Sequence, residues 1–87
     1  MSSNITIINE TVTDTVDYTY TIPEKCVSLA LRADGDVLVN VVGTTDTWKI
    51  ESGLKESFEG TVAIKLRGEQ INFAADATSN IEIRSIQ

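Results

Sequence analysis

The sequence contains no histidine, one cysteine and one proline among its 87 residues. Without histidine, the common zinc and transition-metal ligand sets cannot form, and neither Cys26 nor any serine has an imidazole to activate it as a nucleophile. A single cysteine also excludes a disulfide within the chain. The five glycines are dispersed, so no phosphate-binding loop is present. These absences predict a protein that is not an enzyme and that holds no cofactor and no metal ion.

Basic residues are few and scattered. Seven Lys and Arg stand against 13 Asp and Glu, which gives a formal net charge of −6 at pH 7. Nucleic acids and anionic membranes bind clustered positive charge, so both are disfavoured as partners. No apolar run approaches the ~20 residues that span a bilayer, and the first four residues lack the basic start of a signal peptide. We therefore expect a protein made in a cytoplasm, with no signal peptide and no transmembrane segment.

β-branched residues dominate the composition. The 10 Ile, 8 Val and 11 Thr make up a third of the chain, and these residue types favour strands over helices. Apolar and polar residues alternate in short runs between turn residues, at spacings of roughly 8–12 residues, and no run keeps a helical period over three turns. The sequence therefore predicts an all-β fold. It would be a small antiparallel β-sandwich, jelly-roll-like or Ig-like, with about eight or nine short strands and no substantial helix.

The alternation sets the bounds of the expected strands. They lie at Asn4–Ile8, Thr15–Ile22, Val27–Arg32, Asp36–Val42, Thr47–Glu51, Leu54–Phe58, Val62–Arg67, Ile71–Ala75 and Ile81–Arg84. Asp34-Gly35 predicts a hairpin between the third and fourth of these, with the glycine at positive φ. Cys26 has the parity of Ser28 and Arg32, which places it on the wetter face. Trp48 has the parity of Ile50 and is expected in the core, with a carbohydrate-stacking platform as the alternative.

One expected strand is apolar on both faces. Asp36–Val42 carries valines on one side, but Leu38 and Val42 lie on the other side, next to Asn40. A strand with one solvated face does not need these two residues. They would form an outer apolar patch for self-association or, alternatively, mark a central strand that is buried at both ends.

Residues 1–14 form a second candidate interaction element, an N-terminal arm or edge segment that precedes a single β-sandwich domain at 15–87. Its Thr- and Ile-rich beginning would add as a strand to the sheet edge of a neighbour, or else pair within its own sheet. The polar run Asn9–Asp14 would then act as a hinge. The arm residues predicted to dock are Asn4, Ile5, Thr6, Ile7 and Ile8.

From Tyr18 to the C-terminus, short structural motifs follow one another in a recognisable order. They are Ile22-Pro23, Val27–Arg32, Asp34-Gly35, Trp48-Lys49-Ile50, Ser52-Gly53, Phe58, Ile71–Asp76 and Ile81-Glu82-Ile83. This order resembles that of small β-sandwich virion proteins of tailed bacteriophages. The resemblance implies a β-rich, often trimeric virion component without a cofactor: a head decoration or auxiliary capsid protein, or a small tail or fibre part. It carries over no functional residue.

The composition predicts a non-enzymatic protein, and the resemblance implies that it is a structural protein of a bacteriophage virion. The favoured type is a capsid decoration or auxiliary head protein that binds the particle surface as a homo-oligomer, a trimer by resemblance. Its partners would be further copies of itself and a capsid or other virion protein, with no nucleic acid and no membrane. It would be made in the host cytoplasm and located in the virion, where its acidic charge suits the outer shell better than a DNA-lined interior. The alternative is a carbohydrate- or ligand-binding β-sandwich module, including a tail or fibre part.

Overall fold

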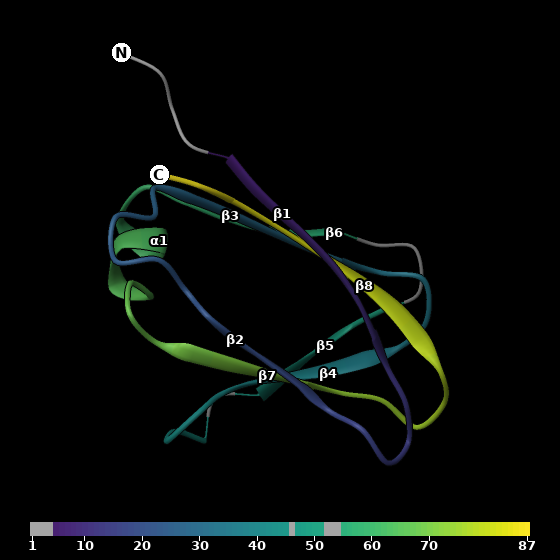
Figure 1. Cartoon of the computed structure of the whole chain (residues 1–87). Helices are drawn as coiled ribbons and strands as arrows, with labels where there is room; N and C mark the ends of the chain where they lie inside the picture. Colours follow the sequence, from purple (N-terminus) through teal and green to yellow (C-terminus); the bar gives the residue numbers. More distant parts are fainter. Residues whose placement is uncertain (1–4, 46, 52–54) are drawn as a thin grey trace.

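The computed structural model describes residues 5–45, 47–51 and 55–87, and the strands in these ranges form two facing antiparallel sheets (Figure 1). Sheet A contains, in spatial order, β1 (Ile5–Val12), β8 (Ser79–Ile86), β3 (Ser28–Ala33) and β6 (Lys55–Glu59). Sheet B contains, in spatial order, β2 (Tyr18–Thr21), β7 (Gln70–Ala74), β4 (Val37–Val41) and β5 (Thr47–Ile50). A short helix, α1 (Thr61–Lys65), lies at one end of the sandwich.

Successive strands mostly alternate between the two sheets. The chain crosses from one sheet to the other between every pair of consecutive strands except β4 and β5, which pair as neighbours in sheet B. The resulting order, β1-β8-β3-β6 facing β2-β7-β4-β5, is that of a jelly roll with two interleaved Greek keys. The all-β fold expected from the sequence is confirmed. Of the two sandwich types that the sequence left open, this strand order matches the jelly roll.

The core lies between the sheets and is built from the alternate, inward-facing residues of each strand. In β3 and β4, for example, every second side chain is buried while those between them are at least partly exposed. The buried apolar cluster comprises Val12, Tyr20, Ile22, Cys26, Leu29, Leu31, Ala33, Val37, Val39, Val41, Ile50, Ile71, Phe73, Ile81 and Ile83. Both halves of the chain therefore contribute to one core.

A buried hydrogen bond links the two sheets. The Tyr20 hydroxyl from β2 and the Ser85 hydroxyl from β8 lie 2.9 Å apart, and both side chains are buried. Each hydroxyl thus has a partner where water cannot supply one, which removes the penalty of burying it.

The turn after β3 does not form the hairpin expected from Asp34-Gly35. It carries the chain into the opposite sheet, and β3 pairs instead with β8 and β6. The turn is fixed to the start of β8, because the Asp34 carboxylate accepts hydrogen bonds from the Asn80 backbone N–H at 2.7 Å and from its side-chain amide at 3.0 Å. Gly35 does not have the expected positive φ. Its role is steric, since a Cβ at this position would collide with Ser79 Oγ.

The prediction of a strand at Val62–Arg67 is wrong, because α1 occupies most of this stretch. The helix follows Gly60, which has a φ of 61°, and the Ile64 N–H donates to the Gly60 carbonyl at 3.0 Å. Ala63 faces the interior and is fully buried, whereas Val62 and Ile64 are exposed. The helix covers one turn and a little more, which is too short for a helical period to be visible in the sequence.

Cys26 also differs from its expected place on the wetter face. It is fully buried and belongs to the core cluster. The strand begins only at Ser28, so the alternation of β3 does not extend back to residue 26. A turn at Pro23 directs the side chain inward, where the Cys26 N–H donates to the Pro23 carbonyl at 3.1 Å and the thiol donates to the Ser28 carbonyl at 3.2 Å.

The two hydroxyls of the inter-sheet hydrogen bond should contribute to stability as a coupled pair. Tyr20→Phe leaves the buried Ser85 hydroxyl without its partner, for which we expect a loss of about 1–3 kcal/mol in the free energy of unfolding. Ser85→Ala added to Tyr20→Phe should cost less than the sum of the two single changes. Urea unfolding measures all three variants, and strictly additive losses would contradict the coupling.

Gly35→Ala tests the close approach of the turn to β8. The added methyl meets Ser79 Oγ, so we expect a destabilisation of about 1–3 kcal/mol, typical of overpacking at a well-packed site. Ser79→Ala removes the colliding atom, and Gly35→Ala should then be nearly neutral in that background. The same cost in both backgrounds, measured by urea unfolding, would show that backbone conformation and not this contact requires glycine.

Candidate interaction surfaces

The outer face of sheet A is apolar at the beginning of β1. Ile5 and Ile7 point away from the core and are 62% and 55% exposed. The β1–β8 register sets Ile5 opposite Ile86 and Ile7 opposite Arg84, so the half-buried Ile86 extends the apolar surface onto the neighbouring strand. Arg84 is held by Glu82 of its own strand at 2.9 Å, so its charge is balanced locally.

Further exposed apolar side chains lie at the same end of the sandwich. The Val27 N–H donates to the Ile86 carbonyl at 2.8 Å, which places exposed Val27 beside the end of β8. Ser28 pairs with Ile86 on one side and with Glu59 on the other, and α1 with Val62 and Ile64 follows directly after Glu59. Figure 1 shows the start of β1, the C-terminus and α1 gathered at this end.

The outer face of sheet B combines apolar and hydrogen-bonding groups. Leu38 and Val42 point outward and are 49% and 42% exposed. Between them a polar row crosses all four strands in register, formed by Thr19, Asn72, Asn40 and Thr47. Thr19 Oγ1 donates to Asn72 Oδ1 at 3.0 Å, and Asn40 Nδ2 donates to Thr47 Oγ1 at 3.2 Å. Non-obligate protein interfaces have such a mixture of apolar and polar groups, as does an ordinary protein surface.

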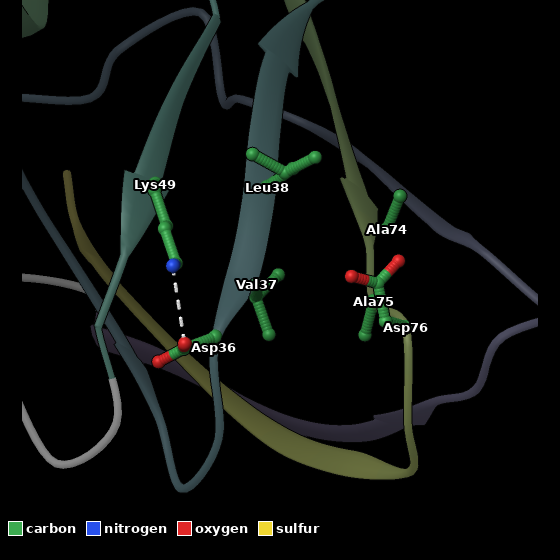
Figure 2. Close-up of a pocket in the computed structure, with 7 residues that line it drawn as sticks. All are labelled: Asp36, Val37, Leu38, Lys49, Ala74, Ala75 and Asp76. Carbon is green, nitrogen blue, oxygen red and sulfur yellow. Dashed lines mark ion pairs between the residues drawn. The ribbon is translucent and has the colours of Figure 1, made fainter.

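A hollow of about 230 Å³ lies on this face beside Leu38. Figure 2 shows the ion pair of Lys49 and Asp36 on one side of it and Asp76 on the other, with Leu38 between them. Lys49 Nζ lies 3.1 Å from Asp36 Oδ2, and both side chains are more than half exposed. The hollow is small compared with the ~300–1,000 Å³ of most ligand pockets. A second hollow, of about 380 Å³, lies on sheet A near Asn9 and Glu82.

The docking residues expected from the sequence do not form a single surface. Ile5 and Ile7 face outward from sheet A, whereas Leu38 and Val42 face outward from sheet B on the other side of the sandwich. Thr6 and Ile8 have the opposite parity to Ile5 and Ile7 and are half-buried. Asn4 lies outside the described residues.

The arm expected at residues 1–14 is not separate from the domain. From Ile5 to Val12 it is an edge strand that pairs residue by residue with β8 of its own chain, and Val12 is fully buried. The polar run from Asn9, which was expected to act as a hinge, belongs to this strand as far as Val12. Polar residues are tolerated there because one face of the strand is open to solvent. The second possibility stated for this segment, pairing within its own sheet, is the one seen.

Trp48 packs inward, as its parity with Ile50 indicated. Its ring is half-buried and meets Phe58 in an edge-to-face contact, with centroids 5.7 Å apart. An indole used for stacking on a sugar presents an open ring face, and this inward packing does not favour that arrangement.

Tyr18 of β2 is half-buried beside the core. Burial raises the pKa of its phenol, and the negative charge of Glu10 and the neighbouring Tyr20 raise it further. Each of these effects disfavours the charged phenolate form. In the described ranges, no three His, Cys, Asp or Glu side chains gather in the way a metal site requires.

The exposure of Val27, Val62 and Ile64 was not expected from the sequence. Val27 was assigned to an inner strand face, and the two helical residues were assigned to a strand. A signal was present in Gly60, since a glycine before a short apolar stretch permits the positive φ from which the helix starts.

Comparison with known proteins identifies a similar fold but no related family. No protein-family model matches the chain, and neither does any curated protein. A solved structure described as a solution NMR structure of a de novo designed double-stranded beta-helix is similar, with a TM-score of 0.67 and 17% sequence identity. The match covers 92% of this chain and 97% of the design. Double-stranded β-helix is another name for the jelly roll, so the similarity agrees with the strand order. Among the described residues, no helix has the length and hydropathy to cross a membrane.

Deleting residues 2–8 tests whether the start of β1 belongs to the domain. The deletion removes the partners of Ile83 to Ile86 in β8 and uncovers buried Ile83 and Ser85. We expect the free energy of unfolding to fall by at least about 2 kcal/mol, the scale of losing a core side chain. Deleting residues 2–4, which removes no described strand, is the matched control. Equal stability of the two truncated chains in urea would restore the free-arm interpretation.

Proposed function

We propose that this chain is a non-enzymatic structural protein of a bacteriophage virion, of the capsid decoration or auxiliary head type, that binds the particle surface as a homo-oligomer. The assignment to a virion rests on the sequence resemblance. The structural support is one observation: large apolar side chains are exposed on both outer faces of the sandwich, at Ile5 and Ile7 and at Leu38 and Val42. A subunit that contacts both its own copies and a lattice needs two such surfaces.

The two surfaces suit different partners. Sheet B offers a broad face in which Leu38 and Val42 flank hydrogen-bonding amides and hydroxyls, the composition of a contact between proteins that also exist apart. Sheet A offers an isoleucine-rich strand at its edge. We therefore assign particle binding to the outer face of sheet B. This exchanges the roles that the sequence suggested for the two sets of residues.

Binding to a repeating lattice explains how a small protein with shallow contacts can attach firmly. A patch of a few side chains gives modest affinity by itself. An oligomer engages several lattice sites together, and linkage of this kind can raise the overall affinity by ~10²–10⁴ without any new contact.

Leu38→Lys tests the proposal. The substitution places a charge on the face assigned to particle binding, next to Lys49 across the β4–β5 ladder, where like charges repel. With capsids assembled from the major capsid protein encoded in the same genome, we expect the unmodified protein to co-sediment. Leu38→Lys should weaken binding at least about tenfold, the equivalent of 1.4 kcal/mol.

Val16→Lys is the matched control, because Val16 is similarly exposed, at 56%, in the loop between β1 and β2. Its binding should stay within twofold of the unmodified protein. A genome without a capsid gene, or an unmodified protein that never co-sediments, would overturn the virion proposal. Binding to a panel of glycans in that case would support the ligand-binding alternative, with the polar row of Asn40 and Asn72 as its site.

A further inference from the structure

We infer that β1 is the self-association edge of this protein: it pairs antiparallel with β1 of a second copy, so that the two A sheets join into one continuous sheet across a two-fold axis. The inference concerns contact between copies and thus rests on the homo-oligomer part of the proposed function. It does not depend on what the oligomer binds.

The four edge strands differ sharply in how well they are protected against pairing with another chain. Edge strands are commonly protected by shortness or by charge. β6 carries Lys55, Glu56 and Glu59 among its five residues, β5 has four residues including Lys49, and β2 has four residues. β1 is eight residues long, is rich in β-branched side chains, and has one charged residue, Glu10. Of the described strands at sheet edges, β1 is therefore the least protected.

The exposed side of β1 matches the chemistry of another strand. β1 has β8 on one side and no described strand on the other. Main-chain donors and acceptors along such an edge are satisfied by water or by an added strand. On the outer face, Ile5 and Ile7 are more than half exposed and are continuous with Ile86. An added strand would hydrogen-bond to the edge and shield these side chains at the same time.

A second copy is the partner that fits, because the first half of β1 is self-complementary. A two-fold axis at Ile7 sets Ile7 opposite Ile7 of the partner subunit and Ile5 opposite Asn9 of the partner subunit. No charged residue then faces a charged residue in the shared ladder. The two Glu10 side chains lie six residues apart along that ladder, roughly 20 Å at 3.4 Å per residue, well beyond the ~8–10 Å screening length at physiological salt.

The charge distribution of the chain favours the same edge. Copies with a net charge of −6 repel one another, so contact is least costly where acidic residues are sparse. The stretch Ile5–Asn9 is uncharged, and the arginine nearest to it, Arg84, is already paired with Glu82.

A contact across a two-fold axis closes on itself and leaves no further copy of the same surface to extend it. The expected oligomer is therefore a dimer, in place of the trimer that the resemblance implied.

Ile7→Lys tests the inference by placing two like charges across the two-fold axis at an exposed position. Light scattering after gel filtration should give the unmodified protein a mass of 19 kDa, twice the 9.5 kDa of one chain, at tens of micromolar. Ile7→Lys should give 9.5 kDa with an unchanged circular dichroism spectrum. Val16→Lys and Leu38→Lys, which charge similarly exposed positions elsewhere, should remain dimers.

A disulfide trap keeps the inference testable if Ile7→Lys does not fold. Directly opposed residues on antiparallel strands have Cα atoms ~4.5–5.5 Å apart, within reach of a disulfide. Cys26 is buried, so Ile7→Cys adds an exposed thiol. We expect Ile7→Cys to form a covalent dimer under mild oxidation at least tenfold faster than Val16→Cys. Equal rates, a monomeric unmodified protein, a trimer, or an oligomer that Ile7→Lys leaves intact would each overturn the inference.

The outcomes separate this inference from the proposed function. A dimer that Ile7→Lys disrupts but that never binds a capsid would overturn the virion role and leave the β1 contact established. A monomer that binds capsids in a Leu38-dependent way would overturn the β1 contact and leave particle binding established.

Discussion

The contact between the turn after β3 and the start of β8 is the constraint on which the strand order depends. Asp34 holds Asn80 through two side-chain bonds and a backbone bond of 3.1 Å, and Gly35 leaves room for Ser79. This brings β8 alongside β3 and sends the next strand, β4, into the opposite sheet. A true hairpin at this turn would place β3 and β4 in one sheet and leave β8 without its central position.

The surfaces follow from that order. With β8 in the interior of sheet A, β1 becomes an edge strand, and its outward-facing Ile5 and Ile7 stay exposed while its other face lies over the core. With β4 in the interior of sheet B, the outward Leu38 and Val42 lie on a broad face, flanked by strands on both sides. The two apolar surfaces thus lie on different sheets. The proposed self-association through sheet A and the proposed attachment through sheet B therefore use different residues.

The features that the sequence predicted correctly are those that depend on residues close together in the chain. The bounds of β3, β4, β5 and β7 were expected to within one residue, and Leu38 and Val42 do face outward, because the two-residue period of a strand is a local property. Strand pairing depends on distant residues: Asp34 reaches Asn80 across 46 positions, and Ile5 pairs with Ile86 at the other end of the chain. Neither the missing hairpin nor the place of the N-terminal segment could be derived from local patterns. The helix α1 was not predicted for a different reason: it is too short to show a helical period in the sequence.

The strand order itself is most directly tested by nuclear Overhauser effects between backbone protons of the labelled protein. We expect cross-strand signals between Leu31 and Ile83 and between Leu29 and Ser85, the residues that face one another in the β3–β8 ladder. Signals between Leu31 and Leu38 in their place, the pair that a hairpin at Asp34-Gly35 would bring together, would contradict the jelly-roll order and every surface assigned from it.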